Sequence, residues 1–156
     1  MNSGTPFDVA VVGGGLIGAE LARALQGMSV ALIAPGPERE SEAAGKFDSR
    51  VYAISPANVA FLARLGKGQK TPQPRMTPVH AMRVFGDDGS SRIEFDAYAA
   101  GVSELAWIVE DRVLQDALWR GLEAQDGLSR FTSGSVEKIE FSRNHANLCL
   151  SDGGTV

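Results

Sequence analysis

The chain has 156 residues, with 15 Lys and Arg against 19 Asp and Glu, so its net charge is −4. This acidic balance argues against a nucleic-acid partner, whereas a hydrophobic fraction of 44% is enough for a globular core. The single cysteine, Cys149, excludes an internal disulfide and fits a reducing compartment, where we expect it to be a small core residue. Neither a signal-peptide pattern nor an apolar run of about 18 residues is present, which predicts a soluble, cytoplasmic type of domain.

The first predicted elements form a βαβ unit. Asp8–Val12 is a short apolar run without polar alternation, which is typical of a strand buried on both faces. Three glycines break this run, and a helix follows with Ile17, Leu21 and Leu25 as its apolar row. Ser29–Ala34 is a second buried strand. A strand, a helix and a second strand in this spacing predict parallel pairing with a right-handed crossover.

Mixed elements are predicted for the middle of the chain. Arg50–Ile54 is extended, and Ser55 as N-cap with Pro56 at the first helical position starts a helix that runs to Leu65. The segments 82–85 and 92–95 flank a Gly-Asp-Asp-Gly turn and therefore predict a hairpin. Asp111 is expected to cap a helix whose leucines fall on one row, at positions 114, 118 and 122.

The last third predicts a strand, a hairpin and a turn. Ser129–Thr132 is a candidate third parallel strand, and Val136–Phe141 with Asn147–Leu150 forms a second hairpin. Ser151–Gly154 is a turn with only two residues after it, so we expect the chain to be truncated relative to its architecture. The predicted fold class is α/β, Rossmann-like, with a parallel βαβ core and inserted β-hairpins.

The glycines of the first turn carry the functional prediction. Gly13, Gly15 and Gly18 give the pattern G-x-G-x-x-G between a strand and a helix. In this pattern the first glycine permits the tight turn, the second admits a pyrophosphate and the third packs the helix closely on the sheet. The helix N-terminus adds free N–H groups and a partial positive charge. The alternative is a glycine turn that serves packing only, which leaves the run of three glycines unexplained.

An acidic residue for the ribose hydroxyls is expected at the end of the second strand, and it is missing. The position holds Ala34, and the nearest acids are Glu38 and Glu40 in the following loop. Either one of these acids reaches back to the ribose, or the backbone and water recognise it.

Two charged segments are further candidates. The guanidinium of Arg50 could pair with a pyrophosphate, or it could be an exposed group that bridges to Asp48. Arg112 and Gln115 follow the capping Asp111 and could be plain surface residues. His80 and His145 are isolated, so no metal site is predicted, and no catalytic residue is assigned.

Three segments, in order, resemble the flavoprotein aromatic hydroxylases. Phe7–Ala34 is similar to the FAD-binding start of that family, and Asp48–Ser55 to its D-x-R-x-x-A-L-S segment. Leu105–Gln115 resembles the G-x-I-V-E-N-R-x-x-Q stretch of the ubiquinone-biosynthesis branch, with Asp111 in place of Asn. Ala34 departs from the family's usual acid.

The resemblance implies the N-terminal part of a class A flavin monooxygenase, with residues 1–156 as part of the FAD-binding domain and about 67–105 as an excursion towards the substrate domain. FAD, NAD(P)H and O₂ would then hydroxylate a polyprenylated phenol or quinol ring, with possible peripheral membrane or multi-enzyme association. This portion alone is expected to be inactive, because the family's later Gly-Asp segment would follow Val156. The cofactor-binding residues implied are Gly13, Gly14, Gly15, Leu16, Ile17, Gly18, Arg50, Arg112 and Gln115.

Two other functions stay open from the sequence. One is another FAD oxidoreductase with the same front end, such as a reductase that acts on prenyl chains. The other is a non-catalytic module that binds NAD or another nucleotide, which the missing acid at Ala34 favours slightly. Selectivity for flavin over nicotinamide would separate the enzymes from the module.

Overall fold

The computed structural model describes residues 6–36, 47–65 and 75–156, which fall into two compact units. The first unit comprises residues 1–42 and 115–156, and the second comprises residues 43–114. Helix α3 (Asp111–Glu123) contributes its first turn to the second unit and its remainder to the first.

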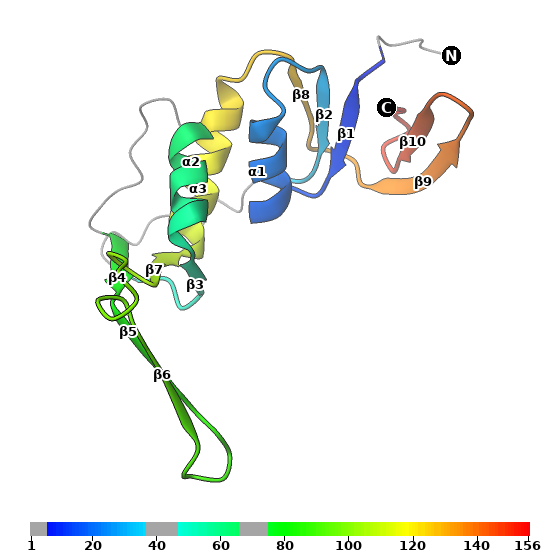
Figure 1. Cartoon of the computed structure of the whole chain (residues 1–156). Helices are drawn as coiled ribbons and strands as arrows, with labels where there is room; N and C mark the ends of the chain where they lie inside the picture. Colours follow the sequence, from blue (N-terminus) through cyan, green and yellow to red (C-terminus); the bar gives the residue numbers. More distant parts are fainter. Residues whose placement is uncertain (1–5, 37–46, 66–74) are drawn as a thin grey trace. The chain divides into compact units, whose positions relative to one another are not determined.

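A parallel sheet forms the centre of the first unit. Its strand order is β1 (Val9–Val12), β2 (Val30–Ile33) and β8 (Leu128–Phe131), and β1 is joined to β2 by α1 (Leu16–Ala24). Figure 1 shows the three strands side by side with β2 in the middle. All four residues of β2 are buried. The predicted βαβ unit and the third parallel strand are therefore confirmed.

A hairpin of β9 (Val136–Phe141) and β10 (Ala146–Leu150) covers one face of this sheet. Leu148 and Leu150 of β10 form a buried cluster with two side chains of β2, Ala31 and Ile33. Successive side chains of a strand alternate between its faces, so the intervening residues of β2 point to the opposite face. Helices α1 and α3 lie on that side (Figure 1).

Helix α3 packs through the leucine row that its spacing predicts, since Leu114, Leu118 and Leu122 are all buried. Polar contacts tie it to α1 as well. The guanidinium of Arg23 donates to the carbonyl of Gly121 at 2.6 Å, and the Gln125 amide donates to the carbonyl of Ala22 at 2.8 Å. Hydrogen bonds therefore join α1 to α3 through Gly121 and to the residues just after α3 through Gln125.

Burial in the first unit differs from the sequence pattern in two places, and the prediction of a first strand buried on both faces is wrong. The apolar row of α1 does not face the core: Ile17 is 79% exposed and Leu21 is also exposed, whereas the small side chains of Ala19 and Ala22 are fully buried. A helix that approaches a sheet closely must present small residues to it, so the larger ones turn outward. Strand β1 lies at the edge of the described sheet, and only Val11 of its residues is buried.

The second unit contains an antiparallel sheet with the strand order β3-β7-β4. Its helix α2 begins as predicted, because the Ser55 hydroxyl accepts the N–H of Asn58 at 3.2 Å and Pro56 is the first helical residue. The predicted hairpin is also present, as β5 and β6. The bounds of these elements are β3 (Val51–Ile54), α2 (Pro56–Leu65), β4 (Met76–Val79), β5 (Ala81–Phe85), β6 (Arg92–Asp96) and β7 (Ala106–Glu110).

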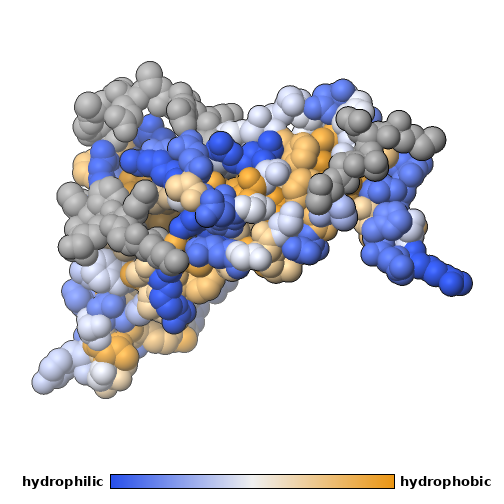
Figure 2. All heavy atoms as spheres, turned by 90° about the horizontal axis from the view of Figure 1, so that it is seen from above, coloured by the Kyte–Doolittle hydropathy of each residue, from blue (hydrophilic) through white to orange (hydrophobic). Residues whose placement is uncertain are grey.

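Every residue of β5 and β6 is exposed, including several large apolar side chains. In the space-filling view hydrophobic residues accordingly reach the surface among hydrophilic ones (Figure 2). No helix within the described ranges is long and apolar enough to cross a membrane.

The turn predicted at Ser151–Gly154 returns the chain along β10. Thr155 forms a bridge with Cys149, and the N–H of Val156 donates to the carbonyl of Leu148 at 3.0 Å. Cys149 is half-buried on β10.

Candidate functional site

The glycine loop, Gly13–Gly15, leads from the end of β1 into α1. Gly13 has a φ of 105°, which side chains rarely allow, and its N–H donates to the carbonyl of Ile33 at the end of β2 at 2.9 Å. The loop therefore starts from a position fixed by the sheet. Gly15 is the N-cap of α1, so the first N–H groups of the helix, which have no partner within the helix, point towards the loop.

The two other glycines of the fingerprint differ in the space around them. A Cβ on Gly18 would lie 2.0 Å from the carbonyl oxygen of Gly13, which is backbone and cannot move aside. A Cβ on Gly15 would meet nothing within 4 Å. Gly18 is thus required by the fold itself, whereas the fold leaves open the space beside Gly15, where a ligand could approach the backbone.

The middle glycine of the loop contacts a residue that sequence reasoning missed. The indole Nε1 of Trp119, on α3, donates to the carbonyl of Gly14 at 3.0 Å. A Cβ on Gly14 would lie 2.6 Å from Cζ2 of the indole ring. Trp119 is only 4% exposed. No local pattern could have indicated this contact, because the two residues are 105 positions apart.

The position expected to carry an acid is buried. Ala34 follows β2, is 3% exposed, and would lie 2.7 Å from a Cβ on Gly14. Its methyl group therefore packs against the glycine loop and offers no hydrogen-bond acceptor. Glu38 and Glu40 lie outside the described residues.

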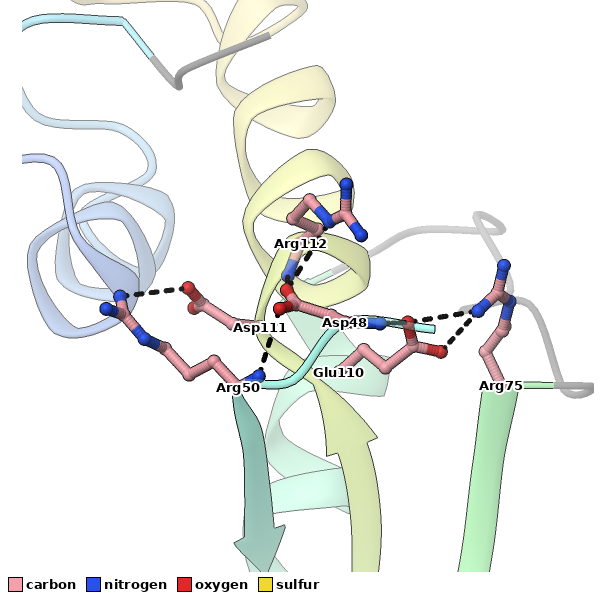
Figure 3. A network of polar contacts seen from close by, with 6 residues as sticks. All are labelled: Asp48, Arg50, Arg75, Glu110, Asp111 and Arg112. Atoms are coloured by element: carbon pink, nitrogen blue, oxygen red, sulfur yellow. Dashed lines mark hydrogen bonds and ion pairs between the residues drawn. The ribbon is translucent and has the colours of Figure 1, made fainter. Parts of the chain in front are cut away.

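In the second unit, six charged residues form a polar cluster where β7 ends and α3 begins (Figure 3). Its members are Asp48, Arg50, Arg75, Glu110, Asp111 and Arg112. The β3–β7 register brings the two charged segments together. Val51 pairs with Glu110, and the N–H of Asp111 donates to the carbonyl of Arg50 at 3.0 Å. Two of the three segments that resemble the hydroxylases, Asp48–Ser55 and Leu105–Gln115, thus contribute neighbouring strands.

Glu110 is the buried member of the polar cluster, at 6% exposure. Its carboxylate accepts two hydrogen bonds from Nη1 of Arg75, at 2.7 and 3.0 Å, and one from the N–H of Asp48 at 2.7 Å. Burial by itself would raise the pKa of Glu110, but the Asp48 N–H and the Arg75 guanidinium outweigh it and hold the pKa below its ordinary value. The Arg75 guanidinium also lies 4.8 Å from the centre of the Phe47 ring.

Asp48 stabilises the start of α3 from another segment. Its carboxylate accepts the N–H of Arg50 at 3.0 Å and the N–H of Arg112 at 3.3 Å, and Nε of Arg112 lies 3.4 Å away. These donors, the Arg50 N–H first, hold the pKa of Asp48 below its ordinary value. The expectation that Asp111 supplies the cap is therefore corrected, since Asp48 is the acceptor for this N–H group.

The side chain of Arg50 pairs with Asp111, with 3.4 Å between Nη1 and Oδ2, and its backbone N–H donates to Asp48. Arg50 remains 71% exposed in its side chain, so its guanidinium is accessible. A guanidinium held by one carboxylate and open to solvent keeps donors free for an anionic ligand.

The predicted site residues are thus divided between the units. The glycines with Leu16 and Ile17 lie in the first, as does Gln115, half-buried on α3. Arg50 and Arg112 meet in the polar cluster of the second. No group of three or more potential metal ligands occurs in the part of the chain that the structure describes.

No protein-family model matches the chain, but curated proteins do. It is 32% identical to 3-demethoxyubiquinol 3-hydroxylase of Escherichia coli, over 97% of this chain and 39% of that protein. It is 30% identical to ubiquinone hydroxylase UbiL of Rhodospirillum rubrum, over 96% and 34%. Over the aligned part, the chain is therefore similar to hydroxylases of ubiquinone biosynthesis. It spans about two fifths or less of the length of these relatives.

Solved structures agree on the fold. PqsL of Pseudomonas aeruginosa matches with a TM-score of 0.70 and 17% identity, over 96% of this chain and 39% of PqsL. HpxO of Klebsiella pneumoniae, solved with FAD and uric acid, matches with a TM-score of 0.62 and 17% identity, over 95% and 36%. At this identity the likeness concerns the fold alone.

Proposed function

We propose that the chain is the FAD-binding part of a flavin-dependent hydroxylase of ubiquinone biosynthesis. The observation that carries the proposal is the glycine loop, in which Gly13 and Gly18 are dictated by the fold while Gly15 opens onto free space. The relatives named for ubiquinone hydroxylation and the fold shared with an FAD complex support it.

The residues present fit the diphosphate of FAD. Gly13, Gly14 and Gly15 bring backbone close to it, and Leu16, Ile17 and Gly18 supply the first N–H groups of α1. These N–H donors carry no net charge, but the partial positive charge at the helix N-terminus also attracts the phosphate oxygens. Ala34 does not fit a ribose-binding acid, and a carboxylate at the end of β2 therefore takes no part in ribose recognition.

Arg50, Arg112 and Gln115 are proposed to lie along the cofactor. Arg50 supplies a charged donor, and the polar cluster limits its freedom through Asp111. Arg112 is fixed by Asp48 at the start of α3, three residues before Gln115. When bound, FAD supplies the redox chemistry with NAD(P)H and O₂, and the protein orients it and excludes water.

For the whole protein we propose a polyprenylated aromatic substrate, with association at the periphery of the membrane or in a multi-enzyme assembly. Residues 1–156 would be part of the FAD-binding domain, with about 67–105 reaching towards the substrate domain. The exposed apolar side chains of β5 and β6, such as Phe85 and Ile93, support this placement, since such residues are normally covered.

The test is a titration of the chain with FAD, followed by quenching of flavin fluorescence, with NAD as competitor. We expect saturable binding that NAD does not displace. Gly15→Val fills the open space and should weaken binding by at least about tenfold. Ala24→Val, which introduces the same valine side chain at the exposed far end of α1, should bind like the wild type.

Two results would contradict the proposal. A folded chain that prefers NAD would favour the nucleotide-binding module, for which the alanine at position 34 is the specific observation. A folded chain that binds neither would contradict a cofactor role for the glycine loop.

A further inference from the structure

Trp119 packs against the glycine loop at Gly14. Its ring leaves no room for a side chain on Gly14, and its indole N–H is hydrogen-bonded to the Gly14 carbonyl at 3.0 Å. Helix α3 is joined to α1 by the hydrogen bond from Arg23 to Gly121, and the segment just after α3 by the hydrogen bond from Gln125 to Ala22. The indole is therefore a fixed group, buried and not free to follow the loop.

The hydrogen bond determines where the next N–H points. The carbonyl of Gly14 and the N–H of Gly15 belong to one planar peptide unit, and no cis peptide occurs in the described chain. In a trans unit the two groups point in opposite directions. With the carbonyl directed at Trp119, the Gly15 N–H is directed away from α3.

The loop needs such a constraint because glycine residues sample many backbone conformations. An unrestrained run of three glycines would lose conformational entropy when it closes on a ligand, and this loss weakens binding. A loop ordered before the ligand arrives avoids most of the loss. The sheet fixes Gly13 through Ile33, but the peptide between Gly14 and Gly15 has Trp119 as its fixed partner.

We propose that Trp119 is a positioning residue for the dinucleotide: its indole N–H holds the Gly14–Gly15 peptide so that the Gly15 N–H is presented to the diphosphate. The inference rests on the proposed function and adds a residue that the cofactor does not touch. It also helps to explain why position 14, between the first two fingerprint glycines, is itself glycine in this chain, since a side chain there would clash with the indole and with Ala34.

The test separates the hydrogen bond from the packing. Trp119 is replaced in the full chain by its benzothiophene analogue, which keeps the fused ring and has sulfur in place of the N–H. Trp119→Phe is the simpler variant, and Trp107→Phe is the control for loss of an indole elsewhere. Binding of FAD and of ADP is titrated for each, together with unfolding by denaturant.

We expect the analogue to fold, with reduced resistance to denaturant because the Gly14 carbonyl loses its donor, and to bind both ligands about three- to tenfold more weakly because the loop is no longer held in place before the ligand binds. FAD and ADP should be affected alike because both carry a diphosphate. In nuclear magnetic resonance spectra of the ligand-free chain, the Gly15 amide signal should shift or broaden in the analogue. Trp107→Phe should leave both affinities unchanged.

Wild-type affinity in the analogue, or a loss for FAD without one for ADP, would overturn the inference and leave the proposed function intact. An unchanged Gly15 signal would overturn it as well. A wild-type chain that binds neither ligand would overturn the proposed function and the inference with it.

Discussion

The glycine loop and the polar cluster both hold predicted cofactor-binding residues, and they do so by different physics. The loop is positioned by steric fit: a Cβ has no room at Gly18 or Gly14, and the closest side-chain partner is the neutral indole of Trp119. The polar cluster is positioned by charge: Glu110 and Asp48 accept hydrogen bonds from the Arg75 guanidinium and from three backbone N–H groups, and Asp48 also forms an ion pair with Arg112. The loop should therefore respond to volume and the cluster to charge and pH.

The largest effect is expected from added volume in the loop. Gly18→Ala places a Cβ 2.0 Å from the Gly13 oxygen, so backbone must move, and we expect the free energy of unfolding to fall by about 3 kcal/mol. Gly15→Ala is the matched variant, since its Cβ meets open space and the fall should be about 1 kcal/mol or less. Urea unfolding measures both, and equal losses would show that steric fit does not distinguish the two glycines.

The polar cluster should respond most strongly at its buried carboxylate. Glu110→Gln removes the charge opposite Arg75 and weakens the bond from the Asp48 N–H, and we expect a loss of about 1 to 2 kcal/mol in unfolding free energy. Glu94→Gln is the control, because Glu94 is exposed on β6 and its arginine partners are 3.5 and 3.6 Å away. A loss at Glu94 as large as that at Glu110 would contradict the role of burial.

Lowering the pH should weaken the polar cluster specifically. The pKa values of Glu110 and Asp48 are lower in the folded chain than their ordinary values of 4.5 and 3.8. Their stabilisation is therefore complete above these ordinary values and is lost as the pH falls through the folded values. Acid unfolding of the wild type and of Glu110→Gln, compared between pH 6 and about pH 3, should give a flatter profile for the variant. Parallel profiles would mean that Glu110 does not contribute.

The local part of the fold could be predicted from the sequence because its signals are local. The glycine turn, the helix cap at Ser55 and the two hairpins each depend on residues close together in the chain. The apolar row of α1 does not indicate which side of that helix is buried, because periodicity identifies a face but not the element that covers it. In α1 the buried side is formed by Ala19 and Ala22, whose small side chains allow the helix to pack closely on the sheet.

The site could be predicted only in its backbone part. Gly13 and Gly18 follow from a spacing rule, whereas Trp119 is 105 residues from Gly14, and Arg75 is 35 residues from Glu110. Such partners depend on how strands and helices pair, which spacing does not encode. The same holds for the ion pairs of the polar cluster. Arg50 pairs with Asp111 and Arg112 pairs with Asp48 because the β3–β7 register places these residues side by side.

The smallest effect on folding is expected at Arg50, a residue of the polar cluster that is proposed to bind FAD. Its pair with Asp111 is exposed and 3.4 Å long, so Arg50→Gln should change the free energy of unfolding by less than about 0.5 kcal/mol. If Arg50 meets FAD as proposed, the same variant should bind FAD several-fold more weakly, and the loss should shrink at high salt because charge is screened. Arg92→Gln, at an equally exposed arginine on β6, is the control and should change neither quantity. An Arg50 variant that folds and binds like the wild type would restrict the polar cluster to a structural role and leave cofactor binding to the glycine loop.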